Sequence, residues 1–198
     1  MRCRTRTLLT AERVAINFLS LLSGISTQTR IFVDAIKPYR TPIYDTRKTT
    51  PLLRKLERYA VRCGGGVNHR FNLSEMAMIK DNHREVSASM SFSEMVAQVK
   101  QATKKKVELE VDNLAQFRQA LKSKADYILL DNMTPLQTRQ AVQWRNQEKS
   151  KILLEASGGI NINNVKQYAA TGVDRISVGS LTHSPKALDI SLVFMPHD

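Results

Sequence analysis

The feature that most constrains the fold is a regular alternation of short apolar runs with helical stretches. Runs that predict strands cover residues 42–46, 76–80, 107–111, 127–130, 151–156 and 175–178, with a weaker seventh run at 189–194. Stretches with helical periodicity cover residues 51–63, 92–104, 114–122, 135–144 and 162–171. Pro51 and Pro135 suit the first turn of a helix, and Thr134 suits an N-cap. Alternation at this repeat length predicts a parallel sheet built from right-handed βαβ units.

Polar residues at the ends of the apolar runs favour a barrel over an open sheet. The later runs are apolar without alternation, as expected when both faces of a sheet are covered. At or near the C-terminal ends of successive runs stand Lys80, Glu110, Asp131, Ser157 and Gly179. Such ends meet around one mouth in a β/α barrel, whereas in an open sheet only those near a switch point share a site. We therefore predict the α/β class, with a parallel, TIM-like β/α barrel that is incomplete or has six to seven strands.

Two helices are expected before the barrel. Thr10 can cap a helix over residues 11–23 that Gly24 ends, and a second helix covers about 27–35. Arginines precede this apolar stretch, as in an export signal, but polar residues interrupt it, which favours an amphipathic helix. No apolar run approaches membrane-spanning length. Because we find no linker or low-complexity segment, we expect residues 1–198 to form one domain.

The chain is strongly basic, with 30 Lys and Arg against 18 Asp and Glu and a formal net charge of +12. This balance is typical of nucleic-acid binding, of recruitment of anionic small molecules, or of a cationic surface without a specific role. Only residues 104–106 form a run of lysines, and the few aromatic residues are not interleaved with the basic ones. We therefore expect neither a specific nucleic acid nor a membrane as a partner.

The chain has two cysteines, Cys3 and Cys63, which provide no framework for disulfides. Cys63 ends an apolar helical stretch and is expected to be a buried thiol. Free thiols favour a reducing, cytoplasmic compartment.

Two glycine motifs follow consecutive late strands and predict a phosphate site. Ser157-Gly158-Gly159 precedes an expected helix, and Gly179-Ser180 follows the next strand. Glycines let backbone N–H groups approach a phosphate, and loops after adjacent late strands form the usual phosphate site of β/α barrels. The alternative, that these are only tight turns, is weaker because two such motifs occur on neighbouring strands. Gly64-Gly65-Gly66 follows a helix, and we interpret it as a flexible or closely packed turn that positions residues 68–70.

Cations and carboxylates complete the predicted mouth. The cations that could converge on one polyanionic ligand are Arg47, Lys48, His69, Arg70 and Lys80. We expect His69 to donate a hydrogen bond to an anion rather than act as a base, because neighbouring cations disfavour its protonation. Glu110 and Asp131 can hold a divalent metal, bind sugar hydroxyls or offset a developing positive charge. These residues together indicate transfer of a phosphorylated sugar to an anionic acceptor.

The motifs that carry these residues also resemble those of a known family. In chain order they are DTRKTTP (45–51), YAVRCGGGVNHR (59–70), IKDNH (79–83), LEVDN (109–113), LLDN (129–132), EASGGI (155–160) and ISVGSLTHS (176–184). Almost the whole chain resembles the quinolinate phosphoribosyltransferases, which are the carboxylating nicotinate-nucleotide pyrophosphorylases. The resemblance implies that quinolinate and phosphoribosyl pyrophosphate give nicotinate mononucleotide, pyrophosphate and CO₂, with Mg²⁺, in NAD biosynthesis.

The resemblance implies a role for each matched residue. The carboxylates of quinolinate would be held by Arg47, Lys48, His69, Arg70 and Lys80. The catalytic residues would be Lys48, Lys80, Glu110 and Asp131. Of these, Glu110 and Asp131 would also bind the ribose hydroxyls and the metal. The 5′-phosphate would be held by Ser157, Gly158, Gly159, Gly179 and Ser180, and the protein would be a homodimer or a higher homo-oligomer.

The chain departs from the family pattern in three respects, the mildest of which is Asn72 in place of a glycine after His69-Arg70. Family members carry an N-terminal α/β sandwich domain that covers the barrel mouth of a neighbouring subunit, and no such domain is visible in residues 1–198. Leu52 stands where the family often has glycine, which is expected to reshape the loop after Lys48 slightly. Two alternatives therefore stay open. One is a barrel with impaired or no activity that serves as a binding or interaction protein, and the other is a related phosphoribosyltransferase that uses another anionic acceptor, such as nicotinate.

Overall fold

A computed structural model describes residues 4–87 and 89–193, and its centre is one parallel sheet. The strands in these residues are β1 (Ile43–Tyr44), β2 (Ala77–Ile79), β3 (Val107–Val111), β4 (Tyr127–Asp131), β5 (Leu153–Ser157) and β6 (Arg175–Ser177). Their order is β1-β6-β5-β4-β3-β2, and every pair is parallel. Because β2 to β6 neighbour one another in sequence order and β1 returns to pair with β6, the winding is that of a β/α barrel. The predicted fold class is confirmed, with an opening between β1 and β2.

Each of the six stronger apolar runs contains an observed strand. The bounds of β3 agree with the prediction, and the other strands end within one or two residues of it. The prediction of a strand in the weaker seventh run is wrong for residues 189–193, where the backbone is irregular. The last residue of that run, Phe194, lies outside the described residues.

An extended segment, residues 67–70, lies in the opening between β1 and β2, and we call it the seam segment. The N–H of Val67 donates to the carbonyl of Ile43 at 2.8 Å, and its carbonyl accepts from the N–H of Asp45 at 3.1 Å. Near β2, Nη1 of Arg70 donates to the carbonyl of Met76 at 2.7 Å. The seam segment therefore joins the two edges of the sheet through a few backbone and side-chain hydrogen bonds.

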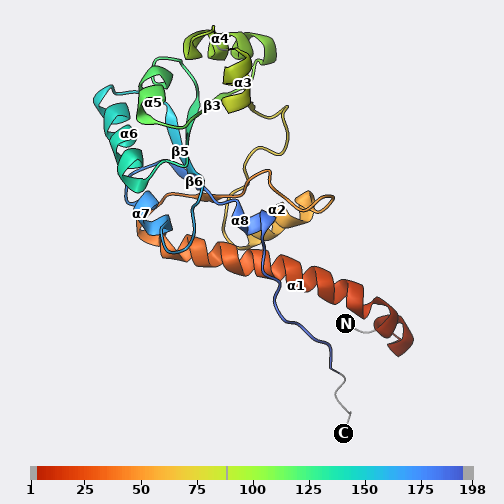
Figure 1. The fold of residues 1–198 in the computed structure, drawn as a ribbon. Helices are drawn as coiled ribbons and strands as arrows, with labels where there is room; N and C mark the ends of the chain where they lie inside the picture. Colours follow the sequence, from red (N-terminus) through yellow and green to blue (C-terminus); the bar gives the residue numbers. More distant parts are fainter. Residues whose placement is uncertain (1–3, 88, 194–198) are drawn as a thin grey trace.

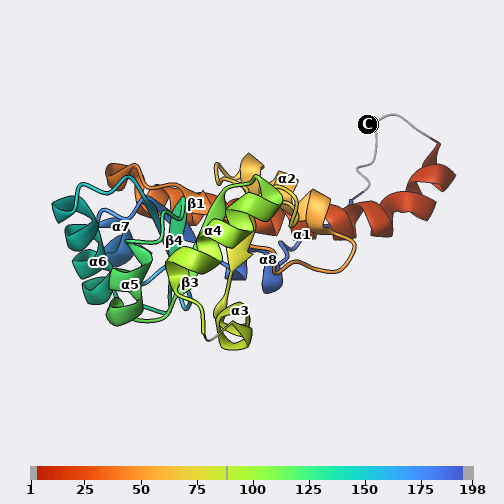
Figure 2. The ribbon, with the colours of Figure 1, turned by 90° about the horizontal axis from the view of Figure 1, so that it is seen from above.

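Helices cover the outside of the sheet, as Figures 1 and 2 show. They are α1 (Thr5–Ala35), α2 (Arg54–Cys63), α3 (Asp81–Val86), α4 (Phe92–Thr103), α5 (Leu114–Ala120), α6 (Pro135–Gln147), α7 (Val165–Ala169) and α8 (Ser180–His183), with a 3-10 turn at Lys37–Tyr39. As predicted, Pro135 opens α6 and the hydroxyl of Thr134 accepts from the N–H of Gln137 at 3.3 Å. Pro51 lies in a turn before α2 instead of in its first turn. Sequence analysis did not predict α3 and α8.

The first helix differs most from its prediction. It is one continuous helix of 31 residues, so the predicted break at Gly24 is wrong. Thr10 lies inside it, and its hydroxyl donates to the carbonyl of Arg6 at 2.8 Å. A Cβ on Gly24 would lie 1.9 Å from the carbonyl oxygen of Lys186, so this glycine permits close packing instead of ending the helix. The buried residues of α1 all lie in its C-terminal half, and its N-terminal half extends beyond the rest of the molecule (Figure 1).

By length and composition alone, α1 is long and apolar enough to cross a membrane. The expectation that no segment reaches this length is wrong, because it assumed a break at Gly24. Core helices and N-terminal signals pass the same test, so this finding is weak. Exposed apolar side chains in the N-terminal half are Leu9, Val14, Phe18 and Leu19.

The three consecutive glycines pack the start of the seam segment against α1. A Cβ at Gly64 would lie 2.4 Å from the carbonyl oxygen of Ser26 and 2.6 Å from Cβ of Thr29. Of the two interpretations offered for these glycines, a closely packed turn is therefore the correct one.

Cys63 is exposed and free, so the expectation of a buried thiol is wrong. The buried residues of α2 are Glu57, Ala60 and Val61, and the helical phase turns Cys63 away from that face. Cys3 lies outside the described residues.

Leu52 adopts the left-handed backbone conformation, with φ of 68°, and its side chain is fully exposed. This conformation costs a residue with a Cβ about 1–2 kcal/mol, and glycine avoids that cost. After allowing for the greater flexibility of glycine in the unfolded chain, we expect Leu52→Gly to raise the free energy of unfolding by about 1 kcal/mol in urea denaturation. As a control, Leu136→Gly in the first turn of α6 also removes an exposed leucine and should lower the free energy of unfolding, by at most about 1 kcal/mol. A loss of stability in Leu52→Gly would contradict the strained loop.

Candidate active site

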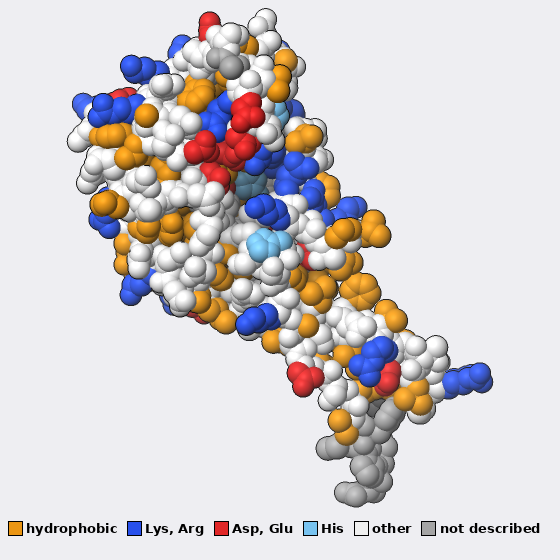
Figure 3. Space-filling model, in the orientation of Figure 1, with side chains coloured by type: hydrophobic (Ala, Val, Ile, Leu, Met, Phe, Trp, Pro, Cys, Tyr) orange, Lys and Arg blue, Asp and Glu red, His pale blue; other side chains and the backbone are white. Residues whose placement is uncertain are grey.

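One cavity of about 660 Å³ opens at the C-terminal ends of the strands, and every residue predicted for the site lines it. These residues are Arg47, Lys48, His69, Arg70, Lys80, Glu110, Asp131, Ser157, Gly158, Gly159, Gly179 and Ser180. The cavity is also lined by residues that the sequence analysis did not assign to the site, among them Asn132, Glu155, Ser177 and His183. On the face shown in Figure 3, acidic side chains lie beside basic ones around a hollow.

The acidic side of the cavity lies at the ends of β3 and β4. Carboxylate oxygens of Glu110, Asp112 and Asp131 lie within 4.8 Å of one another. Burial raises the pKa of Asp131, and the charge of Glu110 raises it further. Clustered carboxylate oxygens are the donors that Mg²⁺ prefers, so this group fits the predicted metal. Asp112 was missed as a candidate, although it follows Glu110 by two residues and strand alternation would have indicated it.

Lys80 connects the acidic side to the rest of the mouth. Its Nζ lies 2.9 Å from Oε2 of Glu110, whose side chain is buried, while Lys80 itself is partly exposed. The backbone N–H of Lys80 donates to Nδ1 of His83 at 3.1 Å, which fixes the start of α3. The ion pair therefore holds an ammonium group at the boundary between the acidic and basic sides.

The basic side is formed by the loop after β1, which carries Arg47 and Lys48, and by the seam segment, which carries Arg70. Arg70 is buried, and burial together with the nearby charge of Arg47 lowers its pKa. The two guanidinium groups therefore repel each other. An anion bound between them would relieve this repulsion, and carboxylates match the guanidinium geometry.

The glycine loops follow β5 and β6. Gly158 has a φ of 88°, and a Cβ there would lie 2.2 Å from Oδ1 of Asn132, so glycine is required. Gly159 has a φ of 62°, and nothing lies within 4 Å of where its Cβ would be. This open space lets an anion approach the backbone N–H groups of the loop.

At the floor of the cavity and beneath it, charged side chains fill the interior of the barrel. Nη2 of Arg175 donates to Oε1 of Glu108 at 2.6 Å, and Nε of Arg175 pairs with Glu155. The hydroxyl of Ser177 donates to Oε1 of Glu155 at 2.5 Å. The guanidinium carbon of Arg175 lies 4.1 Å from the centre of the Tyr127 ring. Sequence analysis missed this interior network, whose signal was a charged residue inside each of three apolar runs.

His69 joins the interior network, and its surroundings differ from the prediction. Nε2 lies 3.4 Å from Oε2 of Glu108 and 3.3 Å from Oε2 of Glu155. Although burial lowers the pKa of His69, these two carboxylates raise it to about 9. The expectation that cations disfavour its protonation is wrong, because the imidazole faces carboxylates.

The other ring nitrogen of His69 is also engaged, since Nδ1 accepts a hydrogen bond from the backbone N–H of Arg70 at 2.8 Å. A doubly protonated ring has no lone pair for this bond, so the carboxylates favour the imidazolium while the Arg70 N–H favours the neutral ring. Both nitrogens contact the protein, and the role of His69 in binding quinolinate stays a prediction.

The two interior carboxylates differ in their affinity for a proton. His69 and Arg175 hold the pKa of Glu155 at about 2 in spite of its burial. Burial and the charge of Glu155 raise the pKa of Glu108. Two carboxylates facing one guanidinium leave one negative charge, and this favours a proton on His69 or on Glu108.

Comparison with known proteins agrees with this geometry. A family model described as "Quinolinate phosphoribosyl transferase, C-terminal domain" matches residues 25–193. The chain belongs to this family. The family resemblance inferred from the motifs is therefore confirmed.

Several relatives of the quinolinate phosphoribosyl transferase family are longer than this chain. The nicotinate-nucleotide pyrophosphorylase (carboxylating) of Mycobacterium leprae is 47% identical over 193 residues, which are 97% of this chain and 67% of that protein. A probable enzyme of the same name from Bacillus subtilis is 45% identical, over 93% of this chain and 63% of its own length. The crystal structure of NadC from Streptococcus pyogenes matches with a TM-score of 0.86 and 44% identity, over 94% of this chain and 65% of that one. The chain thus spans about two thirds of the length of these relatives.

We expect His69 to titrate with a midpoint of about 9 in an NMR titration of its ring proton, because Glu108 and Glu155 stabilise the imidazolium. The ring-proton signal that disappears in His69→Gln is the signal of His69. In Glu155→Gln the midpoint should fall by about one pH unit or more, because a neutral amide attracts the imidazolium less. A midpoint at or below the ordinary value of 6.5 would show that the Arg70 N–H keeps Nδ1 unprotonated.

Proposed function

We propose that this chain transfers the phosphoribosyl group of phosphoribosyl pyrophosphate to quinolinate, with loss of CO₂, in NAD biosynthesis. The observation that carries the proposal is that one cavity combines a cationic side, a carboxylate cluster and two glycine loops. A dicarboxylic pyridine, a ribose and a 5′-phosphate need these three kinds of group side by side. The names of the relatives in Mycobacterium leprae and Bacillus subtilis support the same activity.

Quinolinate would bind on the basic side of the cavity. Arg47 and Arg70 offer planar guanidinium groups that can each bind a carboxylate through two parallel hydrogen bonds. Lys48 stands on the same loop as Arg47. Lys80 lines the same cavity at the boundary with the acidic side. We include His69 as a further candidate ligand, which requires its ring to exchange a protein contact for a substrate contact.

The phosphoribosyl group would bind across the other half of the cavity. The backbone N–H groups around Gly159 and Gly179 and the hydroxyls of Ser157 and Ser180 would hold the 5′-phosphate. Glu110 and Asp131 would accept hydrogen bonds from the ribose hydroxyls.

Mg²⁺ is part of the proposal, and the carboxylates of Glu110 and Asp131, with Asp112 beside them, fit its preference for hard oxygen ligands. When bound, the ion would neutralise charge on the pyrophosphate and so make it a better leaving group.

In the first step the lone pair of the pyridine nitrogen forms a bond to C1 of the ribose as the bond from C1 to the pyrophosphate oxygen breaks. The electron pair of the broken bond leaves with pyrophosphate. Positive charge builds on the ribose ring, and the carboxylates of Glu110 and Asp131 are placed to offset it. The ammonium groups of Lys48 and Lys80 would stabilise the charge on the departing pyrophosphate.

In the second step the pyridinium ring accepts the electron pair of the bond to the adjacent carboxylate. That carboxylate leaves as CO₂, and the ring carbon takes a proton from water. A cation on the departing carboxylate would stabilise the reactant more than the transition state. The contact to the departing carboxylate should therefore be weaker than the contact to the carboxylate that nicotinate mononucleotide retains.

We also propose that the chain acts in the cytoplasm as a homodimer or a higher homo-oligomer. The exposed apolar side chains in the N-terminal half of α1 support an oligomer, because a partner subunit could bury them. Light scattering during gel filtration tests it, and a monomer at micromolar concentration would contradict it.

The proposed chemistry predicts that Lys80→Ala and Glu110→Ala each lower kcat/KM for quinolinate by about 100-fold or more, because each removes charge that acts on the transition state. The free energy of unfolding should change little for Lys80→Ala, because Lys80 is partly exposed, and by about 1–3 kcal/mol for Glu110→Ala, because the Glu110 side chain is buried. Steady-state assays with urea denaturation of the same samples measure both. Near-normal turnover in both variants would refute the assignment.

The identity of the acceptor can be tested by comparing the binding of a dicarboxylate with that of a monocarboxylate. Quinolinate should bind at least about 100-fold more tightly than nicotinate in calorimetry, because a second carboxylate adds charge-assisted hydrogen bonds worth about 1.5–3 kcal/mol each. Arg70→Gln should remove most of this difference. Equal affinities in the unsubstituted chain would favour a relative with another acceptor, whereas tight binding of quinolinate without turnover would favour the inactive barrel.

A further inference from the structure

Helix α2 places three charged side chains behind the basic side of the cavity. Arg54, Glu57 and Arg58 are spaced so that they share one face of the helix, and we call them the α2 clamp. None of the three is among the described residues that line the cavity. They contact instead the segments that carry the cations.

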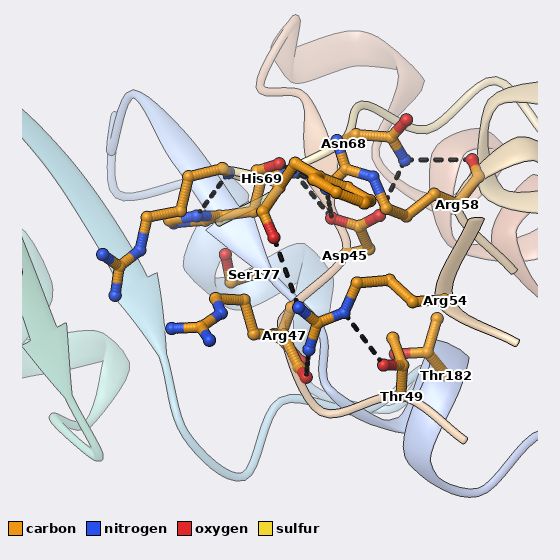
Figure 4. A network of polar contacts seen from close by, with 12 residues as sticks. Asp45, Arg47, Thr49, Arg54, Arg58, Asn68, His69, Ser177 and Thr182 are labelled. Atoms are coloured by element: carbon orange, nitrogen blue, oxygen red, sulfur yellow. Dashed lines mark hydrogen bonds and ion pairs between the residues drawn. The ribbon is translucent and has the colours of Figure 1, made fainter. Parts of the chain in front are cut away.

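Arg54 joins the loop after β1 to the chain beyond the seam segment (Figure 4). Its Nη2 donates to the carbonyl of Arg47 at 2.7 Å, and its Nε donates to the hydroxyl of Thr49 at 3.1 Å. Its Nη1 donates to the carbonyl of Phe71 at 3.2 Å. A single guanidinium thus fixes backbone atoms next to both Arg47 and Arg70.

Glu57 lies one helical turn after Arg54 in α2 and also holds the loop after β1. Its carboxylate is buried and accepts from the backbone N–H of Thr50 at 3.2 Å. From the other wall, the hydroxyl of Thr182 in α8 donates to the carbonyl of Lys48 at 2.7 Å. The loop that carries Arg47 and Lys48 is thus held by side chains, since β1 already ends at Tyr44.

Arg58 holds the seam segment. Its Nη1 donates to the carbonyl of His69 at 2.6 Å and lies 3.9 Å from Oδ1 of Asp45. Asp45 in turn accepts from the backbone N–H of His69 at 2.6 Å and from the side chain of Asn68 at 2.6 Å (Figure 4). The carbonyl and the N–H of one seam residue are therefore both fixed by charged groups.

We propose that the α2 clamp positions two cationic arms of the acceptor site, and so sets the preference of this site for a dicarboxylate over a monocarboxylate. One arm is the loop after β1, which carries Arg47 and Lys48, and the other is the seam segment, which carries Arg70. This rests on the proposed function in that quinolinate is the acceptor. A dicarboxylate needs two cations at a fixed separation, whereas a monocarboxylate needs one. Arg54 contacts the backbone on both sides, and Arg58, one turn further along the same rigid helix, holds the seam segment, so together they fix that separation.

The variant that tests the clamp is Arg54→Lys, which keeps the charge but cannot reach three acceptors with a planar fork. We expect the Kd of quinolinate to rise about tenfold or more in calorimetry. The Kd values of nicotinate and of phosphoribosyl pyrophosphate with Mg²⁺ should change by less than about threefold, because one arm suffices for nicotinate and the glycine loops are untouched. The matched control is Arg62→Lys on the same helix, whose exposed side chain contacts the Tyr59 ring, and it should leave all three affinities unchanged.

A second measurement needs no ligand. Amide hydrogen exchange of residues 47–50 should become faster in Arg54→Lys than in Arg62→Lys, at equal global stability. Unchanged quinolinate affinity, or an equal loss for all three ligands, would overturn the clamp. Failure of the unsubstituted chain to bind quinolinate would overturn the proposed function instead, and the exchange rates would then still decide whether Arg54 positions the loop.

Discussion

The opposed charges buried inside the barrel are the interaction on which the rest of the site depends. Glu108, Glu155 and Arg175 come from three different strands, and His69 joins them from the seam segment. Ion pairs in such surroundings add little net stability, but removing one partner leaves an uncompensated charge and costs about 3–5 kcal/mol. The network therefore ties the seam segment, through His69, to strands β3 and β5 on the inside of the barrel.

The same strands build the interior network and the mouth above it. Successive residues of a strand point to opposite faces, so residues two apart share a face at different heights. In β3, Glu108 lies in the interior and Glu110 reaches the cavity. In β5, Glu155 belongs to the interior network and Ser157 lies at the rim. One strand pattern thus produces a buried layer that holds the barrel together and an upper layer that is free to meet a ligand.

Much of the fold and of the cavity lining could be predicted from sequence because it depends on local pattern. Apolar runs mark strands, and the ends of parallel strands converge, which is why Lys80, Glu110 and Asp131 could be assigned to one mouth. What failed depended on distant contacts. Gly24 looks like a helix end until Lys186 is packed against it. The surroundings of His69 were misjudged because one of its partners, Glu155, lies 86 residues further along the chain.

The arrangement of charge around the cavity gives a strongly basic chain a way to orient an anion as well as attract it. The overall charge of +12 attracts any anion, but it cannot orient one. Orientation comes from local crowding of like charges, with Arg47 beside Arg70 on one side and Glu110 beside Asp131 on the other. A ligand that places carboxylates against the first pair and hydroxyls or a cation against the second relieves both repulsions at once. Lys80 is paired with Glu110 at the boundary, and the remaining N–H donors of its partly exposed ammonium group can bind an anion on the basic side.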